Sequence, residues 1–252
     1  MGKIIAVANQ KGGVGKTTTA VNLAACLSEA GKETLLVDFD PQGNASSGLG
    51  LGAGKKTVYE AILMQCEMAG TIEKTKFSRL SVAPSDIRLA GAELELAQLE
   101  QREFRLRAAL NQVRDHYDYI LIDCPPSLGL LTINALAASQ SVLIPIQCEY
   151  YALEGVTALM DTVRRVRNTV NPGLSIEGVL MTMFDGRTNL CLQVVAQVKK
   201  HFKDKVFKVA IPRNVRLGEA PSHGLPITKY DIRSSGAEAY TLLAREVIRN
   251  NR

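Results

Sequence analysis

The stretch Asn-Gln-Lys-Gly-Gly-Val-Gly-Lys-Thr-Thr, residues 9–18, decides the fold of this 252-residue chain. The apolar run Ile4–Ala8 precedes it, and a segment of helical period follows it. Backbone N–H groups can approach phosphate oxygens closely only where side chains are absent, which the three glycines of this loop provide. A strand, a glycine-rich loop and a helix in this order predict a phosphate-binding loop at the positive end of the helix.

The residue types of this loop predict how it would bind ATP and Mg²⁺. Lys16 can reach the β- and γ-phosphates, and the hydroxyl of Thr17 can ligate the metal ion. The usual pattern G-x-x-x-x-G-K-[ST] fails at its first position, which holds Gln10, and the loop carries an additional lysine, Lys11, before the paired glycines. The expected nucleotide-binding residues of the loop are Lys11, Gly12, Gly13, Val14, Gly15, Lys16, Thr17 and Thr18.

Two acidic segments end other apolar runs of the chain. Residues 35–44 contain Asp38 and Asp40, and residues 120–126 contain Asp123. Phosphoryl transfer needs a positioned Mg²⁺, neutralised charge and an oriented water. We expect Asp123 to hold the Mg²⁺ shell through water and Asp40 to orient or deprotonate the attacking water, while the role of Asp38 stays open. The alternative is that these carboxylates only cap the ends of strands.

Short apolar runs alternate with helical patterns along the whole chain. Apolar residues on both faces of the strands, with helices between them, predict an α/β fold: a doubly wound, mostly parallel sheet with helices on both faces. We expect one domain over residues 1–252, with Leu89–Leu110 helical and Leu80–Val82 in a hairpin. The expected strands are Ile4–Ala8, Thr34–Val37, Ile120–Ile122, Ser141–Ile144, Gly178–Met181 and, more weakly, Val206–Ile211.

Composition excludes several classes of protein. The five cysteines include no closely spaced pair, which argues against a disulfide framework, a zinc site and a cysteine-ligated cluster. The N-terminal apolar run is too short for a signal peptide, and no apolar run approaches a membrane span, so we expect a cytoplasmic protein. The charge is asymmetric. Residues 1–186 hold 17 Lys and Arg against 20 Asp and Glu, whereas residues 187–252 hold 13 against 5, which predicts a basic surface in the last quarter of the chain.

With Lys11 and the acidic segments in view, the sequence resembles the ParA/Soj family of chromosome- and plasmid-partitioning ATPases. This family belongs to the P-loop NTPase class with a deviant Walker A loop, which includes MinD. The resemblance covers essentially the whole chain. The motifs that carry it are residues 11–18, 38–44, 123–129 and 147–155, together with Arg187–Asn189 and Ile211–Arg216.

The resemblance implies a two-subunit ATP-bound state, in which Lys11 reaches the phosphates of the partner subunit and Gly12 lies where the two loops approach. Together with the roles expected above for Lys16 and Asp40, this makes Lys11, Lys16 and Asp40 the expected catalytic residues. It also implies ATP-dependent binding to double-stranded DNA without sequence preference, nucleoid association, and hydrolysis stimulated by a ParB-type centromere-binding protein. Met183, Pro212 and Asn214 are the expected adenine contacts.

The resemblance and the basic composition together give the expected DNA-binding residues. Arg187 and Arg216 match basic positions of the Soj branch, and Lys199 and Lys200 could extend the patch. Lysine and arginine side chains neutralise phosphates and release counterions, which gives affinity without sequence preference. The alternative is a basic surface that only interacts with solvent.

Three other functions share this class of loop. A MinD-like membrane ATPase would need an amphipathic basic C-terminal extension, but Tyr240, Leu243 and Val247 form a stripe typical of a core helix. We therefore expect no membrane partner. A reductase of the nitrogenase iron protein type would need paired cysteines at a dimer axis. A small-molecule kinase would need an acceptor site, which the sequence does not reveal.

Overall fold

The computed structural model describes residues 2–52, 54–149 and 152–251, and only the backbone of residues 152–155. Within these residues, one sheet of seven strands runs in the order β3-β4-β2-β5-β1-β6-β7. All neighbours pair in parallel except β3, which is antiparallel to β4. The strands are β1 (Lys3–Val7), β2 (Thr34–Asp38), β3 (Glu73–Lys74), β4 (Leu80–Ala83), β5 (Tyr119–Asp123), β6 (Ser141–Gln147) and β7 (Ser175–Thr182).

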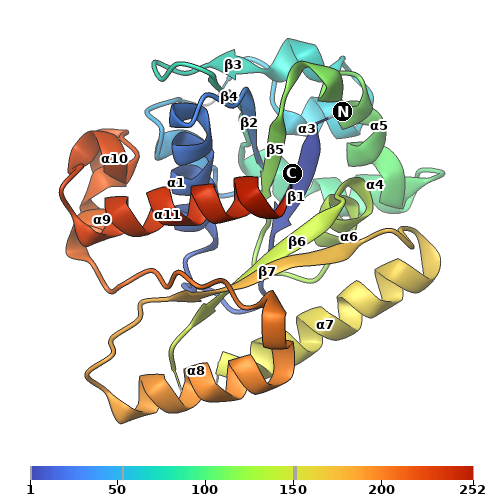
Figure 1. The fold of residues 1–252 in the computed structure, drawn as a ribbon. Helices are drawn as coiled ribbons and strands as arrows, with labels where there is room; N and C mark the ends of the chain where they lie inside the picture. The colour runs from blue at the N-terminus through green and yellow to red at the C-terminus, as the bar shows by residue number, and fades with distance from the viewer. Residues whose placement is uncertain (1, 53, 150–151, 252) are drawn as a thin grey trace.

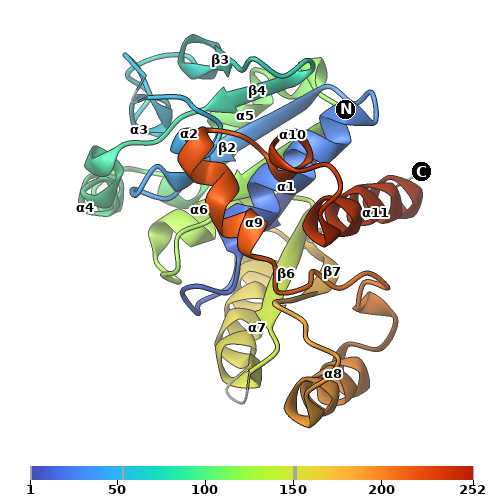
Figure 2. The same ribbon diagram turned by 90° about the vertical axis from the view of Figure 1, so that its left-hand side faces the viewer.

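Helices connect the strands and cover both faces of the sheet (Figures 1 and 2). The α-helices are α1 (Lys16–Glu29), α2 (Asn44–Ser47), α3 (Val58–Ile62), α4 (Ala92–Ala97), α5 (Arg105–Asn111), α6 (Leu130–Ala138), α7 (Ala152–Thr169), α8 (Asn189–Phe202), α9 (Val215–Glu219), α10 (Ile227–Tyr230) and α11 (Ser235–Asn250). The 3₁₀ turns are η1 (Met68–Thr71), η2 (Ile87–Ala90), η3 (Arg102–Phe104), η4 (Arg114–His116), η5 (Lys203–Lys205) and η6 (Ala220–His223).

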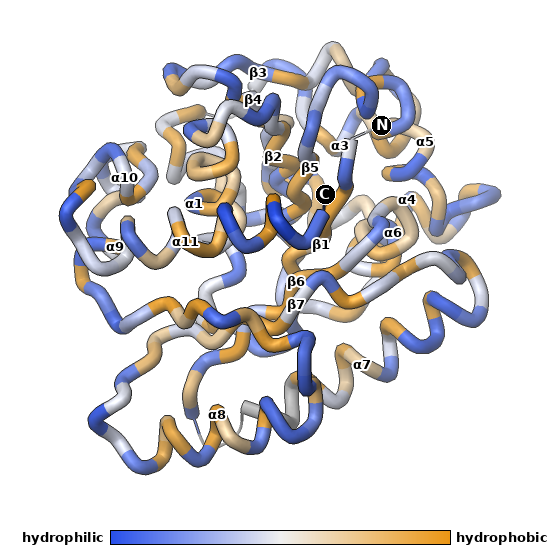
Figure 3. Tube along the Cα trace, in the orientation of Figure 1, coloured by the Kyte–Doolittle hydropathy of each residue, from blue (hydrophilic) through white to orange (hydrophobic). Residues whose placement is uncertain are grey.

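Two apolar cores lie on the two faces of the sheet. Successive strand residues point to opposite faces, so Ile4 of β1 packs with α5 to α8 while Ile5 packs with α1 and α11. Strands β2 and β5 are buried throughout, which is why their sequences are continuously apolar. Along α7, α8 and α11, apolar residues that belong to these cores alternate with polar residues, as the tube in Figure 3 shows. The predicted doubly wound α/β fold is confirmed.

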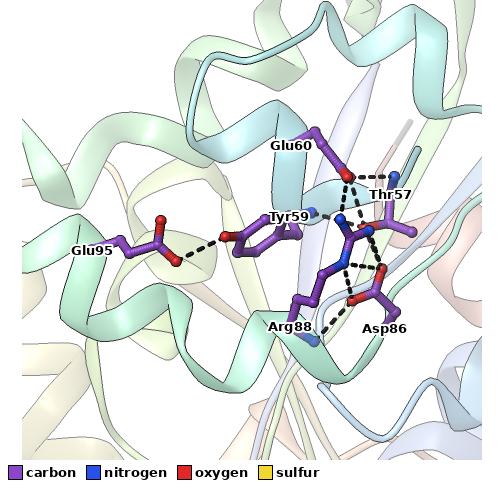
Figure 4. Close-up of polar contacts among 6 residues, drawn as sticks. All are labelled: Thr57, Tyr59, Glu60, Asp86, Arg88 and Glu95. Carbon is purple, nitrogen blue, oxygen red and sulfur yellow. Dashed lines mark hydrogen bonds and ion pairs between the residues drawn. The ribbon is translucent and has the colours of Figure 1, made fainter. Parts of the chain in front are cut away.

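Residues 52–110 contain the predicted hairpin, β3–β4, and a broken helical segment. The helical segment expected around Leu89–Leu110 consists of η2, α4, η3 and α5, with a break before η3 where Gln101 adopts a φ of 51°. A polar network, shown in Figure 4, ties α3 to η2 and α4. Its members are Thr57, Tyr59, Glu60, Asp86, Arg88 and Glu95.

The weak prediction of a strand at Val206–Ile211 was wrong. This segment follows β7 but forms no continuous ladder with it, because the two meet at an isolated bridge between Val179 and Val206 and at one hydrogen bond from the N–H of Ile211 to the Met181 oxygen, at 2.8 Å. The backbone N–H of Lys208 donates to the side chain of Glu246 instead of to a neighbouring strand. The ring of Phe207 fills the space above Gly178, where a Cβ would lie 2.4 Å from it. These side-chain contacts replace a regular ladder.

The strand order reverses at β1, which lies between β5 and β6. In open α/β sheets, ligands bind outside the carboxyl ends of the strands at such a reversal. The phosphate-binding loop follows β1 at this point, and Asp123 ends β5 beside it. The fold therefore brings the loop and the acidic segments to one crevice.

Candidate nucleotide-binding site and arginine surface

The loop between β1 and α1 has the backbone that its glycines predict. Gly13 and Gly15 adopt φ values of 73° and 86°, which side chains rarely tolerate. A Cβ on Gly12 would meet nothing within 4 Å, so this glycine borders open space in the single subunit. The helix begins at Lys16 with no side-chain cap, leaving the N–H groups of its first turn available to an anion.

The side chains of Thr182, at the end of β7, and Asn9, just after β1, brace this loop. The hydroxyl of Thr182 donates to the carbonyl oxygen of Val14 at 2.8 Å. The side chain of Asn9 donates to the carbonyl oxygen of Pro145 at 2.6 Å and accepts the N–H of Lys11. These bonds hold the loop against the carboxyl ends of β6 and β7, so that its shape exists before a ligand binds.

Lys16 lies inside the loop among carboxylates. Its side chain is 7% exposed, and Nζ donates to the carbonyl oxygen of Lys11 at 3.1 Å. Burial lowers the pKa of Lys16, and the charges of Asp123 and Asp40 oppose that shift. The ammonium group is therefore held in place by this hydrogen bond, and its other N–H donors can bind phosphate oxygens.

Asp38 is hydrogen-bonded to Ser46, whereas Asp40, two residues further along, is not. Its Oδ2 accepts hydrogen bonds from the backbone and the hydroxyl of Ser46, at 2.8 and 2.7 Å. Burial raises the pKa of Asp38 to about 6, although the Ser46 hydrogen bonds oppose the shift. Asp38 thus fixes the segment before α2. Asp40 is 8% exposed, and its Oδ1 accepts the N–H of Gln42 at 3.0 Å.

Asp123 is a fully buried carboxylate whose two oxygens have no hydrogen-bond partner within the described residues. Burial raises the pKa of Asp123 well above its usual value, Asp38 adds to the shift, and Thr17 and Lys16 oppose it. An orphaned pair of buried oxygens next to a threonine hydroxyl fits a hard cation or its bound water.

The remaining ligands of such a cation would come from the nucleotide. Among the residues that the structure describes, no group of three or more His, Cys, Asp or Glu side chains could hold a metal ion by itself. Mg²⁺ commonly binds through one or two protein groups together with phosphates and waters. The donor set of Thr17 and Asp123 fits that mode.

Lys11 lies on the outer side of the loop, unlike Lys16. Its Nζ lies 3.0 Å from Oε2 of Glu149, and its side chain is 33% exposed. Gln147 donates to the other oxygen of Glu149. Glu149 and Gln147 belong to the segment 147–155 that was noted for family resemblance, but no role was predicted for them. The part of that segment at Tyr150 and Tyr151 lies outside the described residues.

A pocket of about 360 Å³ opens beside Gly15 and Thr18. The three predicted adenine contacts, Met183, Pro212 and Asn214, all line it. Its two walls are joined by backbone hydrogen bonds, from Phe184 N–H to the Ile211 oxygen at 2.9 Å and from Arg213 N–H to the Phe184 oxygen at 3.2 Å. Pockets that bind small ligands usually have volumes of about 300–1,000 Å³. This volume and its position suit a nucleoside attached to phosphates in the loop.

The two predicted DNA-binding arginines lie on neighbouring segments near this pocket. A bridge between Phe184 and Pro212 sets the Arg187 segment beside the segment that leads to Arg216. Arg187 is 90% exposed, and Arg216 is 54% exposed. Both are ion-paired, Arg187 with Asp185 at 2.7 Å and Arg216 with Glu219 at 2.8 Å.

Lys199 and Lys200 do not join this pair of arginines. They lie exposed in the last turn of α8, whereas Arg187 precedes its first turn. Ten residues of helix separate Asn189 from Lys199, a rise of about 15 Å. The lysines can extend a basic surface but do not form one cluster with Arg187.

Comparisons with known proteins show the family of this chain. A family model described as an AAA domain matches residues 2–176. The sporulation initiation inhibitor protein Soj of Bacillus subtilis is 60% identical over 252 residues, which cover 99% of this chain and 100% of that protein. This chain belongs to the ParA/Soj family of chromosome-partitioning ATPases. The chromosome partitioning protein ParA of Myxococcus xanthus is 55% identical, with 100% of this chain and 89% of that protein covered.

A solved structure gives the ligands of a related site. The cobyrinic acid a,c-diamide synthase of Mycobacterium smegmatis, with a bound ATP analogue and magnesium, superposes with a TM-score of 0.87. It is 37% identical, with 99% of this chain and 95% of that chain covered. ATP and Mg²⁺ are the cofactors that the loop, Thr17 and Asp123 of this ParA/Soj family member fit.

Several residues that shape the site were not predicted. Thr182 and Asn9 brace the loop, and Arg213 and Tyr240 line the pocket. None of them stands out in the sequence, because each acts through a contact with a distant segment. No helix in the described part of this family member is both long and apolar enough to cross a membrane.

Proposed function

We propose that this chain hydrolyses ATP in a two-subunit state, in which Lys11 of each subunit reaches the phosphates bound by the other. The observation that carries this proposal is the contrast between the two lysines of the loop. Lys16 is 7% exposed and is fixed inside the loop, whereas Lys11 is 33% exposed on its outer side. The open space at Gly12 is consistent with a second loop approaching there.

The residues of one subunit would have separate roles in ATP binding and hydrolysis. When bound, Mg²⁺ neutralises phosphate charge, and Thr17 and Asp123 hold it, Asp123 through water. Lys16 binds the β- and γ-phosphate oxygens, and the loop N–H groups and Thr18 bind the rest. Asp40, whose orientation is fixed by the N–H of Gln42, orients the attacking water and can accept its proton.

The nucleoside would occupy the pocket beside Gly15. Met183, Pro212 and Asn214 form its walls. Met183 adopts a φ of 50°, a backbone conformation that is uncommon for a non-glycine residue. Asn214 caps α9, so its side chain is held in place by the N–H of Arg216 at 2.8 Å.

The ATP-bound pair would bind double-stranded DNA without sequence preference. The support is the basic last quarter of the chain and the exposed arginines Arg187 and Arg216, with Lys199 and Lys200 as outlying contacts. One subunit contributes few phosphate contacts, and two subunits double them. Dependence on ATP then follows from valency, because ATP controls pairing of the subunits.

Family membership supports three further parts of this proposal. A ParB-type centromere-binding protein would stimulate hydrolysis and so release the pair from DNA. The protein would then act in the cytoplasm on the nucleoid. Residues 1–252 would fold as one domain, which is consistent with a single sheet whose strands come from residues 3–182.

Reversing the two arginine charges tests the DNA surface directly. We expect the double variant Arg187→Glu, Arg216→Glu to bind ATP normally and, with ATP, to have the molar mass of two subunits in light scattering. Its DNA affinity should fall at least 100-fold. The matched control is Arg79→Glu with Arg249→Glu, which makes the same change of net charge at two other exposed arginines. Normal DNA binding by the first variant would place the surface elsewhere.

A further inference from the structure

Both arginines of the proposed DNA surface are held by carboxylates of their own chain. Nε and Nη2 of Arg187 donate to the two oxygens of Asp185, at 2.8 and 2.7 Å. Nη1 of Arg216 donates to Glu219 at 2.8 Å, and its Nε lies 3.7 Å from Asp231. A guanidinium binds a phosphate through the same planar fork of N–H groups. The carboxylates therefore occupy the donors that DNA would need.

Each of these carboxylates is also fixed by a second donor. The backbone N–H of Arg187 donates to Oδ1 of Asp185 at 3.1 Å, and the hydroxyl of Tyr230 donates to Oε2 of Glu219 at 3.0 Å. When an arginine turns to a phosphate, its carboxylate stays in place. A negative charge then remains close to the negative DNA backbone, which opposes binding.

Arg213 shows that Asp185 affects more than one cation. Arg213 is exposed and makes no ion pair within the described part of the chain. It is close enough to help Arg187 hold the pKa of Asp185 low, at about 2. Asp185 stays charged at any physiological pH, so it opposes DNA at all times.

We propose that Asp185 and Glu219 limit the DNA affinity of one subunit, so that stable binding needs the arginines of two subunits together. This inference rests on the proposed DNA binding and gives a role to the ion pairs of Arg187 and Arg216. The phosphates of the DNA backbone compete with the carboxylates for these arginines. Binding replaces each intrachain ion pair by a phosphate contact, and the affinity of a single subunit stays low because that exchange gains little.

The size of the effect follows from the strength of exposed ion pairs. Such pairs typically stabilise by a factor of about 1.4 to 5 each. The pairs of Arg187 with Asp185 and of Arg216 with Glu219 make four in two subunits. With a factor of about 2 for each pair, releasing all four should raise DNA affinity about 16-fold, and releasing two should raise single-subunit affinity about 4-fold.

The test is the double variant Asp185→Asn, Glu219→Gln. The amides keep the shape of the side chains and can still accept from the Arg187 N–H and from Tyr230, so the local fold is kept. Affinity for a random-sequence DNA duplex is measured by fluorescence anisotropy at 100 mM salt, with ATP, with ADP and without nucleotide. We expect an increase of about 10- to 20-fold with ATP and measurable binding in the other two states.

The control is Glu33→Gln, which removes one negative charge from another exposed arginine pair. Arg79 lies 3.7 Å from Glu33, and both residues precede strands at the opposite edge of the sheet. The proposal is overturned if the double variant binds DNA no more tightly than the wild type, or if Glu33→Gln raises affinity as much. Should Glu219→Gln disturb folding, Asp185→Asn alone must still raise affinity more than the control does. Failure of the wild type to bind DNA in any state would instead refute the proposed function.

Discussion

Replacing Asp123 by asparagine should stabilise the protein when Mg²⁺ and nucleotide are absent. The carboxylate of Asp123 is fully buried, with no hydrogen-bond partner for either oxygen among the described residues. At pH 7 it must fold either charged and desolvated or protonated. Protonating an aspartate with an ordinary pKa of about 3.9 costs about 4 kcal/mol at that pH, which is an upper limit to the cost of burying it. Thr17 and, to a lesser extent, Lys16 reduce this cost, and we expect a gain of about 2 kcal/mol for the variant, half of that limit.

The pH dependence of the stability difference between wild type and variant is a sharper test of this prediction. Burial raises the pKa of Asp123 in the folded state, so the folded state binds the proton more tightly than the unfolded state does. Below about pH 4 the group is protonated in both states, and wild type and variant should be equally stable. As pH rises, the wild type should lose stability relative to the variant by up to about 1.4 kcal/mol per unit, until the folded pKa is passed.

Thermal unfolding in EDTA between pH 5 and pH 8 measures both effects. For a chain of this size, about 2 kcal/mol corresponds to a rise of about 4–8 °C in Tm. Adding Mg²⁺ and ATP should raise the Tm of the wild type and raise that of Asp123→Asn less. Asp161→Asn, at a half-exposed carboxylate on α7, is the control and should shift Tm little. A variant less stable than the wild type at pH 8, or a gap in Tm that does not change with pH, would refute the reasoning.

Three further substitutions test the roles of Lys16, Asp40 and Gly12. Lys16→Ala should lose ATP binding at least 100-fold in calorimetric titration, because its buried ammonium is the phosphate ligand, and near-normal binding would contradict that role. Asp40→Ala should bind ATP and accumulate as a stable pair in light scattering, with hydrolysis reduced at least 100-fold; hydrolysis at the normal rate would remove Asp40 from the mechanism. Gly12→Val should fold and bind ATP, because a Cβ there meets nothing within 4 Å. With ATP it should nevertheless stay a single subunit in light scattering. Pairing of this variant at the ATP concentrations that pair the wild type would show that the two loops do not approach at Gly12.

The central strands and the loop could be predicted because their signals are local. Strands β2 and β5 are buried on both faces, so each is a continuous apolar run that ends in an aspartate. The glycines of the loop are required by a backbone with φ values of 73° and 86° at Gly13 and Gly15. Physical constraints of this kind appear in the sequence itself.

The contacts between distant segments could not be predicted. Glu149 holds Lys11 from a position 138 residues away, and Thr182 braces Val14 across 168 residues. The segment Val206–Ile211 is apolar enough for a strand, but Glu246 takes the N–H of Lys208 and breaks the ladder. Asp185 lies only two residues from Arg187, yet nothing in a sequence distinguishes an ion-paired arginine from a free one.

The salt dependence of DNA binding tests the central claim most directly. Affinity for a random-sequence duplex is measured with ATP and with ADP between 50 and 200 mM salt. Two arginines from each of two subunits give four phosphate contacts and a slope of about −3.6 in log affinity against log salt, which is about a 150-fold loss over this range. We expect at least that slope with ATP, and weak or no binding with ADP. A slope near −1.8 with ATP, which one subunit would give, or equal binding with ADP, would contradict it.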